Sequence, residues 1–129
     1  MRKLMLSILP QMYAVCRLDP NGHIPNWALL GDDFISLTRT RSELSVVCLQ
    51  KNVPQEGTKA ERGWRCMKVD GPFDFSVAGV QASLAIPLAE ANISSLAIAT
   101  YETDHLLIKD EDLERTVQVL TQAGHHIQH

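Results

Sequence analysis

Two polar segments in the second half of the chain have the residue types and the spacing to bind an amino acid together. Ser76 marks the start of a predicted helix, where unpaired backbone N–H groups and the positive end of the helix dipole suit a carboxylate. Thr103 and Asp104 follow in a predicted turn, where the carboxylate of Asp104 suits an ammonium group. The pattern therefore predicts a site for a small molecule that carries both charges.

Each of these residues also has a purely structural interpretation. Ser76 is a typical helix N-cap, a role worth about 1 kcal/mol, and Asp104 is a common residue where strands reverse. Gly79 could allow a ligand to approach closely or could let the helix pack closely on a sheet. Tyr101 could form the wall of a pocket or pack across a strand pair. A protein-interaction module that binds no ligand is therefore the open alternative.

The cysteines give little support to redox, metal or thiol chemistry. Cys16, Cys48 and Cys66 are far apart in the sequence, have apolar neighbours and form no C-x-x-C pair. This pattern favours buried, reduced thiols that behave as small hydrophobic side chains.

The histidines give little support to a metal site or to catalysis. His125, His126 and His129 lie at the chain end without a second ligand cluster, which favours a solvated tail. His105 follows Asp104 as in an acid–base couple, but no Ser or Cys nucleophile lies beside them in the sequence. We expect no catalytic residue, no bound metal and no cofactor, and hence no enzyme.

The composition excludes several classes of protein. The chain has 129 residues, of which 45% are hydrophobic, enough for one ordinary domain or two small packed ones. The net charge is −3, 5% of residues are aromatic and the longest basic run is Arg2-Lys3, so nucleic-acid binding is not expected. The apolar run from Leu4 ends at Pro10, too short for a signal peptide or a membrane span. We expect a cytoplasmic protein without a membrane partner.

The elements that must position the site follow one another in the second half. Apolar residues at spacings of three and four predict an amphipathic helix over Ser76–Ala91, with a kink at Pro87 and a left-handed residue at Asn92. A second helix is predicted, with Asp110 as its N-cap and Gly124 as the residue that stops it. The order strand, helix, strand, strand, helix, strand is the ferredoxin-like βαββαβ arrangement of the α+β class. The predicted strands are Arg65–Asp70, Ser95–Tyr101, Leu106–Lys109 and a short one around Ile127.

The first half carries a weaker copy of this pattern. Residues 36–47 resemble residues 97–108 at an offset of 61, with an apolar strand on each side of a turn that holds a hydroxyl and an acid. Asn26–Leu30 leaves room for only a short helix, and Lys51–Gly63 is polar and predicted as a loop with at most a short helix. We predict a tandem duplication, with antiparallel sheets packed against helices: a degenerate unit over residues 1–62 and a complete unit over residues 63–129. The strand Lys3–Leu9 could cross over to the other unit.

Taken together, these segments resemble the ACT-domain family. The chain is similar to small bacterial tandem ACT-domain proteins, to the ACT modules of aspartate kinases and to CASTOR-type arginine sensors. Gly71-Pro72 departs from the Pro-Gly that many amino-acid-binding members carry before the helix, and the short first helix of the front unit is a second departure. The runs that carry the resemblance are Phe73–Val80, Pro87–Ser94, Ala99–Asp104, Asp110–Leu113, Ile24–Ala28 and Phe34–Thr40.

The resemblance implies a non-catalytic regulatory or sensor module that holds an amino acid at an interface between ACT-like units. It implies that the ligand carboxylate meets backbone N–H groups near the helix start, and that strand-end residues meet the amino group or the side chain. The implied partners are the amino acid, a second copy in a homodimer and a regulated protein of unknown identity. The implied binding residues are Ser76, Val77, Gly79, Thr100, Tyr101, Thr103 and Asp104.

Overall fold

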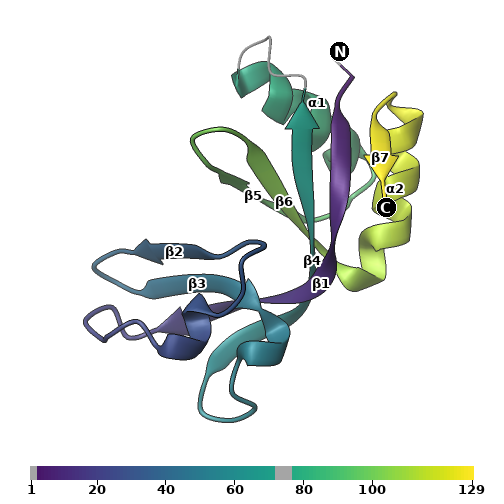
Figure 1. The fold of residues 1–129 in the computed structure, drawn as a ribbon. Helices are drawn as coiled ribbons and strands as arrows, with labels where there is room; N and C mark the ends of the chain where they lie inside the picture. Colours follow the sequence, from purple (N-terminus) through teal and green to yellow (C-terminus); the bar gives the residue numbers. More distant parts are fainter. Residues whose placement is uncertain (1–2, 72–76) are drawn as a thin grey trace. The chain divides into compact units, whose positions relative to one another are not determined.

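The computed structural model describes residues 3–71 and 77–129, which form a mixed α/β fold with a largely antiparallel sheet. The strands follow the order β2-β3-β1-β4-β6-β5, and β7 pairs with β1 (Figure 1). The strands are β1 (Met5–Leu18), β2 (Ser36–Arg39), β3 (Leu44–Leu49), β4 (Lys59–Gly71), β5 (Ser95–Ala99), β6 (Asp104–Lys109) and β7 (His126–Gln128); the α-helices are α1 (Val77–Glu90) and α2 (Leu113–Gln122); the 3₁₀ turns are η1 (Asn26–Leu29), η2 (Gln50–Asn52) and η3 (Asp110–Asp112).

The chain forms two compact units, and β1 and β4 run through both of them. The N-terminal unit comprises Gln11–Trp64, and the C-terminal unit comprises Met1–Pro10 together with Arg65–His129. The prediction that the first strand crosses over to the other unit is therefore confirmed. The division into repeats at residues 62 and 63 stays a prediction.

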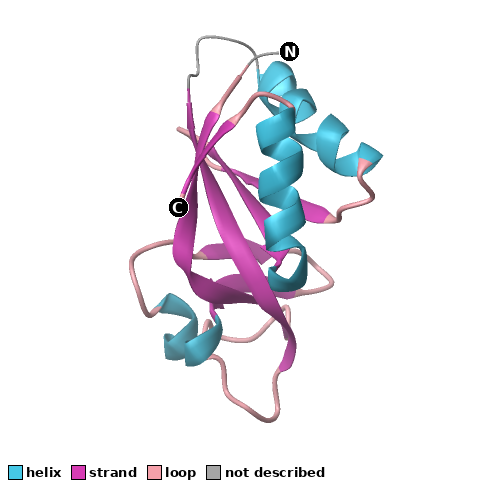
Figure 2. Ribbon diagram, turned by 90° about the vertical axis from the view of Figure 1, so that its right-hand side faces the viewer, coloured by secondary structure: helices cyan, strands magenta, loops and turns pink. Residues whose placement is uncertain are grey.

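The C-terminal unit has ferredoxin-like connectivity with one added strand. Its strand order is β5-β6-β4-β1-β7, and the start of β1 pairs in parallel with β7, with Met5 opposite His126. Both α1 and α2 lie on one face of these strands (Figure 2). The core between the strands and the two helices is built from Leu4, Leu6, Met67, Val69, Val80, Leu84, Leu88, Ile93, Leu106, Ile108 and Leu120.

The ends of the two helices follow the local sequence signals, apart from the start of α2. Asn92 is left-handed with φ of 57°, as predicted, and the Ile93 N–H donates to the Leu88 carbonyl at 2.9 Å, which closes α1. Asp110 does not cap α2, contrary to the prediction. It begins η3, because the Leu113 N–H bonds to the Asp110 carbonyl three residues back, and α2 starts only at Leu113.

The N-terminal unit replaces both helices of the ferredoxin-like pattern with 3₁₀ turns. Its strand order is β2-β3-β1-β4, and η1 and η2 occupy the helix positions in the chain. The loop predicted over Lys51–Gly63 is wrong in its second part, since β4 begins at Lys59. Exposed Lys59 and Glu61 alternate with half-buried Ala60, and these outward charges hide the strand in the sequence. The core of this unit is built from Ala14, Cys16, Ala28, Leu44, Val46, Cys48 and Val53.

The hairpins β2–β3 and β5–β6 have the same register. Arg39 lies opposite Leu44 in the first, and Ala99 lies opposite Asp104 in the second, so equivalent residues are 60 positions apart. The offset of 61 from the sequence comparison is therefore wrong by one residue. The sequence comparison aligned the hydroxyl–acid pair Ser42-Glu43 with Thr103-Asp104. In the backbone pairing, the equivalent residues are instead Arg39 and Ala99, each the last strand residue before its turn.

A threonine closes each of these two hairpins in the same way. The Thr40 N–H donates to the Glu43 carbonyl at 2.8 Å, and the Thr100 N–H donates to the Thr103 carbonyl at 2.8 Å. Each threonine hydroxyl also accepts the N–H three residues later at 3.2 Å. Threonine favours such turns because its hydroxyl can bond to nearby backbone groups.

Candidate functional site

A cavity of about 280 Å³ lies in the C-terminal unit between α1 and the hairpin β5–β6. This volume suits a ligand smaller than a typical drug molecule. Of the side chains in the described part of the chain that line it, three are polar and four are apolar. The lining residues are Gln81, Leu84, Ala85, Ser95, Ala97, Asp104 and Leu106.

The helix and the two strands aim these side chains at the same space. Gln81, Leu84 and Ala85 share one face of α1 because they are three and four residues apart. Ser95 and Ala97 share one face of β5 because side chains alternate along a strand. The small side chains on β5 leave open a space that larger residues at these positions would occupy.

Among the described residues that line the cavity, Asp104 is the only one with a carboxylate. It is the first residue of β6 rather than a turn residue, it is half-buried, and it lies opposite Ala99 of β5. The other polar groups that the described residues place at the cavity are the Gln81 amide and the Ser95 hydroxyl, and none of these lining residues carries a positive charge. This set can hold an ammonium or another cationic group against apolar walls.

The predicted threonines use their hydroxyl groups within the protein. The Thr100 hydroxyl donates to the Thr103 carbonyl at 3.0 Å, and the Thr103 hydroxyl donates to the Val69 carbonyl of β4. Tyr101 is fully exposed at the tip of the hairpin, so the interpretation that it packs across a strand pair is wrong. These residues fix the hairpin that carries Asp104, and their contact with a ligand stays a prediction.

The predicted residues at the helix start are only partly described. Ser76 lies outside the described residues, and Val77 is the first residue of α1. The Gly79 carbonyl accepts the Ser83 hydroxyl at 2.8 Å, and Gly79 does not line the cavity. A role of these three residues in binding a carboxylate stays a prediction.

Asp104 and His105 do not form an acid–base couple. They are consecutive residues of β6 and therefore point to opposite faces of the strand. His105 is buried, and this burial lowers its pKa; nearby Lys68 lowers it further, while Asp104 and Asp70 partly offset the shift.

His125 is buried and bonded, so its predicted place in a solvated tail is wrong. Its Nδ1 accepts the Leu4 N–H at 3.0 Å, which leaves the proton on Nε2 to donate to the Ser83 carbonyl at 2.7 Å. That carbonyl needs a donor because Pro87, four residues later in α1, has no N–H. His125 thus joins Leu4, the residue before β1, to α1.

The three cysteines are buried and free, as predicted. Burial raises the pKa of the Cys66 thiol to about 12. A hydrogen bond between the Cys16 and Cys48 side chains lowers the pKa of Cys16 and raises that of Cys48, and burial raises the pKa of Cys48 further.

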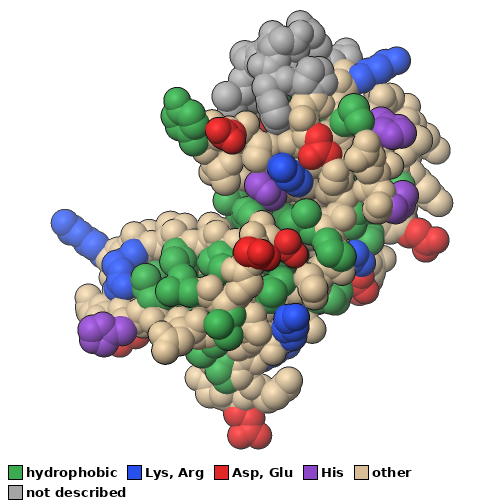
Figure 3. Space-filling view, in the orientation of Figure 1, with side chains coloured by type: hydrophobic (Ala, Val, Ile, Leu, Met, Phe, Trp, Pro, Cys, Tyr) green, Lys and Arg blue, Asp and Glu red, His purple; other side chains and the backbone are tan. Residues whose placement is uncertain are grey.

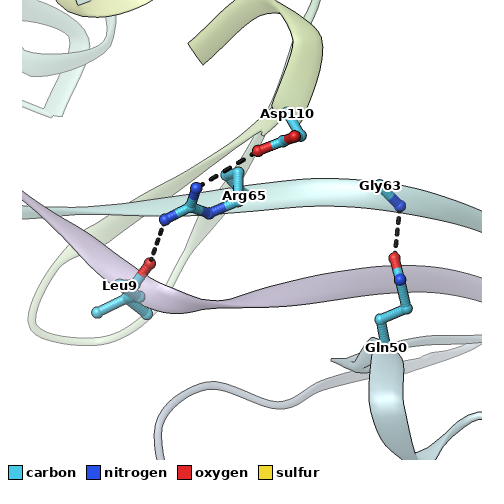
Figure 4. Close-up of polar contacts among 5 residues, drawn as sticks. All are labelled: Leu9, Gln50, Gly63, Arg65 and Asp110. Atoms are coloured by element: carbon cyan, nitrogen blue, oxygen red, sulfur yellow. Dashed lines mark hydrogen bonds and ion pairs between the residues drawn. The ribbon is translucent and has the colours of Figure 1, made fainter. Parts of the chain in front are cut away.

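Polar contacts of β4 anchor the starts of two 3₁₀ turns. In the C-terminal unit, Arg65 donates to the Leu9 carbonyl and to Asp110, each at 3.4 Å (Figure 4). In the N-terminal unit, the Gly63 N–H donates to Gln50 Oε1 at 2.7 Å (Figure 4). Gln50 and Asp110 begin η2 and η3, respectively.

Acidic and basic side chains are interspersed on the face shown in Figure 3 and form no patch of one sign there. Among the helices in the described part of the chain, none has both the length and the apolar character needed to cross a membrane.

Of the described cavity lining, sequence reasoning named only Asp104 as a site residue and missed Gln81, Leu84, Ala85, Ser95, Ala97 and Leu106. One signal in the sequence could have indicated Ser95 and Ala97. Small residues alternate with Leu96 and Ile98 along β5, so one face of the strand carries only small side chains. Gln81 carries a weaker signal, as a polar residue next to the apolar stripe of α1.

Comparisons with known proteins agree with the fold. A family model of the ACT domain matches residues 59–122, and a model of an N-terminal domain matches residues 11–56. The structure of protein Atu0741 from Agobacterium tumefaciens is 39% identical with a TM-score of 0.92, covering 98% of this chain and 93% of that chain.

Two further relatives are regulatory or sensory by name. The Homo sapiens protein named Cytosolic arginine sensor for mTORC1 subunit 1 is 36% identical over 58 residues, which are 44% of this chain and 18% of the sensor. The chain therefore spans less than a fifth of that relative. The regulatory subunit of aspartate kinase from Thermus thermophilus shares the fold, with a TM-score of 0.62, 18% identity and coverage of 92% of this chain and 97% of that chain.

The family match over β4 to α2, the similarity to Atu0741 over nearly the whole chain and the βαββαβ connectivity of the C-terminal unit agree with one another. The chain belongs to the ACT-domain family.

Proposed function

We propose that this protein is a non-catalytic regulatory or sensor module that binds an amino acid in the cavity between α1 and the hairpin β5–β6. The observation that carries the proposal is the half-buried carboxylate of Asp104 in a largely apolar cavity whose described lining residues include no cation. An ammonium group of the ligand would supply the missing positive charge. The apolar walls from Leu84 and Leu106 would contact the aliphatic part of the ligand.

The ligand carboxylate would meet the start of α1. Backbone N–H groups at a helix start lack partners within the helix and face the positive end of its dipole. Ser76, Val77 and Gly79 are the residues that we assign to this role, and Thr100, Tyr101 and Thr103 are assigned to the strand end beside Asp104. Binding would then connect the helix start with the hairpin and shift the equilibrium between two arrangements of the protein.

The names of the relatives support this class of function. One curated relative is named an arginine sensor, and one structure of similar fold is the regulatory subunit of an aspartate kinase. We accordingly propose a cytoplasmic homodimer that regulates a partner protein, with the ligand at an interface between ACT-like units.

We also propose that the chain arose by tandem duplication, with a degenerate unit over residues 1–62 and a complete unit over residues 63–129. The identical register of the two hairpins, 60 residues apart, supports this origin. Gln50 and Asp110, which begin the two 3₁₀ turns, are also 60 residues apart, and each accepts a hydrogen bond from β4.

Thermal unfolding with each of the twenty amino acids at millimolar concentration tests the proposal. A ligand present at about 100 times its Kd adds about 2.7 kcal/mol to the free energy of unfolding. We expect a selective rise in Tm of several degrees for one or two amino acids. A flat panel would favour the alternative, an interaction module that binds no free amino acid.

A matched pair of variants on the hairpin tests the assigned carboxylate. Asp104→Asn keeps the size of the side chain and removes its charge, so it should weaken binding at least several-fold. Glu102→Gln removes a charge from the exposed turn of the same hairpin, away from the cavity, and should leave the affinity unchanged. Equal affinities of the two variants for the ligand would remove Asp104 from the site.

A further inference from the structure

A second cavity, of about 400 Å³, lies within the N-terminal unit. Its lining comes from three neighbouring strands, β3, β1 and β4, and from the residue before β3. The described part of this lining carries charged side chains of both signs, in contrast to the cavity of the C-terminal unit. The side chains concerned are Val15, Arg17, Glu43, Ser45, Lys59 and Glu61.

The strands direct these side chains to one face of the sheet. Arg17 lies opposite Ser45 in the register of β1 and β3, so their side chains share a face. The residues that alternate with them along both strands belong to the core of the N-terminal unit, on the other face. Lys59 shares the face of Arg17, because its neighbour Ala60 packs against that core. The cavity therefore lies over the face of the sheet that points away from the core of this unit.

Several polar groups at this cavity retain hydrogen-bonding capacity. One terminal nitrogen of Arg17 donates to the Ser42 carbonyl at 2.7 Å, which holds the guanidinium in place and leaves most of its five N–H donors available. Within the described part of the chain, the side chains of Glu43, Ser45 and Lys59 form no hydrogen bond or ion pair. The cavity thus offers two cations and one carboxylate for an incoming molecule. Its second acidic residue already has an interaction partner.

We propose that this cavity binds a zwitterionic dipeptide, with the peptide carboxylate between Arg17 and Lys59 and the peptide ammonium at Glu43 and Ser45. Charge-assisted hydrogen bonds of this kind are stronger than those between neutral groups. Half-buried Val15 would contact a small apolar side chain of the peptide. The site is separate from the amino-acid cavity of the C-terminal unit and does not depend on it.

The spacing of the strands sets the length of this ligand. The two cations lie on the neighbouring strands β1 and β4, whereas Glu43 directly precedes β3 on the other side of β1. The midpoint between the cations is therefore one and a half strand spacings, about 7 Å, from β3. An extended dipeptide spans at most about 7 Å, whereas the nitrogen and the carboxylate carbon of a free amino acid are about 2.5 Å apart. A free amino acid is thus too short to bring both of its charged ends to their partners.

Binding of alanyl-alanine, measured by calorimetry and by NMR of the labelled protein, tests the proposal. We expect one molecule bound per chain, with amide shifts confined to β1, β3 and β4 of the N-terminal unit. N-acetyl-alanyl-alanine lacks the ammonium and alanyl-alanine amide lacks the carboxylate, so each should bind about ten-fold or more weakly. Free alanine should also bind at least about ten-fold more weakly, because it spans too short a distance.

Two variants assign each end of the peptide to a residue. Glu43→Gln should weaken alanyl-alanine binding about ten-fold and leave the affinity for N-acetyl-alanyl-alanine unchanged, because that peptide has no ammonium to lose. Lys59→Gln should weaken binding of both peptides that have a free carboxylate and leave the affinity for the amide unchanged. The matched controls Lys51→Gln and Glu56→Gln change exposed residues of the same unit outside the cavity, so they should not alter alanyl-alanine binding.

Absence of saturable alanyl-alanine binding at these strands would overturn the proposal. Equal losses in the variants and their controls, or equal affinities for free alanine and for the dipeptide, would also overturn it. If circular dichroism shows that a variant is unfolded, the comparison of the three peptides on the wild type still decides, because it needs no substitution. Asp104→Asn changes the other unit and should leave alanyl-alanine binding unchanged, so this outcome is separate from that of the amino-acid panel.

Discussion

Removal of the His125 side chain should destabilise the C-terminal unit, because His125 joins Leu4, the residue before β1, to α1. The ring is buried, with 4% exposure, and makes two hydrogen bonds, to the Leu4 N–H at 3.0 Å and to the Ser83 carbonyl at 2.7 Å. His125→Ala leaves both backbone groups without their partner, at a cost of about 1–3 kcal/mol each. We expect a total loss of about 3 kcal/mol in the free energy of unfolding.

A substitution at Pro87 can separate the contribution of the bond between His125 and the Ser83 carbonyl from that of the bond to Leu4. In a Pro87→Ala background the new N–H can bond to the Ser83 carbonyl within α1, so that carbonyl no longer depends on His125. The cost of His125→Ala should then fall by about 1 kcal/mol, which is the typical net contribution of one hydrogen bond. The substitution at Pro87 does not affect the bond to the Leu4 N–H. Loss of that bond should account for the remaining cost of His125→Ala.

Urea unfolding of the wild type, the two single variants and the double variant gives the coupling energy directly. His126→Ala, which changes the exposed neighbour of His125, serves as the control and should shift stability by less than about 0.5 kcal/mol. Amide exchange at Leu4 gives a second reading, since His125→Ala should accelerate it in either background. Additivity of the two substitutions within about 0.5 kcal/mol would refute the assignment of His125 to the Ser83 carbonyl.

Three further predictions concern single side chains. His105 is held neutral in the folded state by burial, so the unfolded state binds the proton more strongly; stability should be complete above about pH 6.5 and decline as the pH falls through that value. His105→Gln should reduce this decline in urea unfolding between pH 5 and 8, and an unchanged decline would assign it to other groups. Asn92→Ala should cost about 1 kcal/mol and Asn92→Gly should not, because φ at this position is 57°; equal Tm values for the two variants would contradict this. Thr103→Val should lose the bond to the Val69 carbonyl and about 1 kcal/mol, while Thr103→Ser should retain it; equal loss in both variants would point to the methyl group instead.

The parts of the fold that follow local rules could be predicted from the sequence. Pro87 inside α1 and left-handed Asn92 at its end were both identified, because each depends on backbone geometry that the residue type itself restricts. The short helical turn at Asn26–Leu29 was found for the same reason, between prolines and glycines that limit its length. The hairpin β5–β6 followed from two apolar runs around a polar turn.

The cavity could not be predicted because it depends on residues that only the tertiary structure brings together. Asp104 was chosen from the sequence, but its place at a cavity depends on the pairing of Ala97 with Leu106 and on the face that α1 turns toward them. His125 was missed because nothing in its sequence neighbourhood reveals that Pro87 leaves a carbonyl without a donor. A carbonyl that lacks its donor within a helix can be recognised only in the structure, where the partner of each buried backbone group is known.

The register of the two hairpins determines how many such sites one chain can offer. An offset of 61 would align Glu43 with Asp104 and give each unit a carboxylate at the same place. The observed offset of 60 instead aligns Leu44 with Asp104, and Leu44 is buried in the core of the N-terminal unit. The position equivalent to Ala97 is Leu37, whose larger side chain would take up space that Ala97 leaves open. The N-terminal unit also has the 3₁₀ turn η1 where the C-terminal unit has α1, so it lacks the helix face that carries Gln81. We therefore expect one bound amino acid per chain in a calorimetric titration with the ligand that the panel identifies, and two per chain would contradict the alignment.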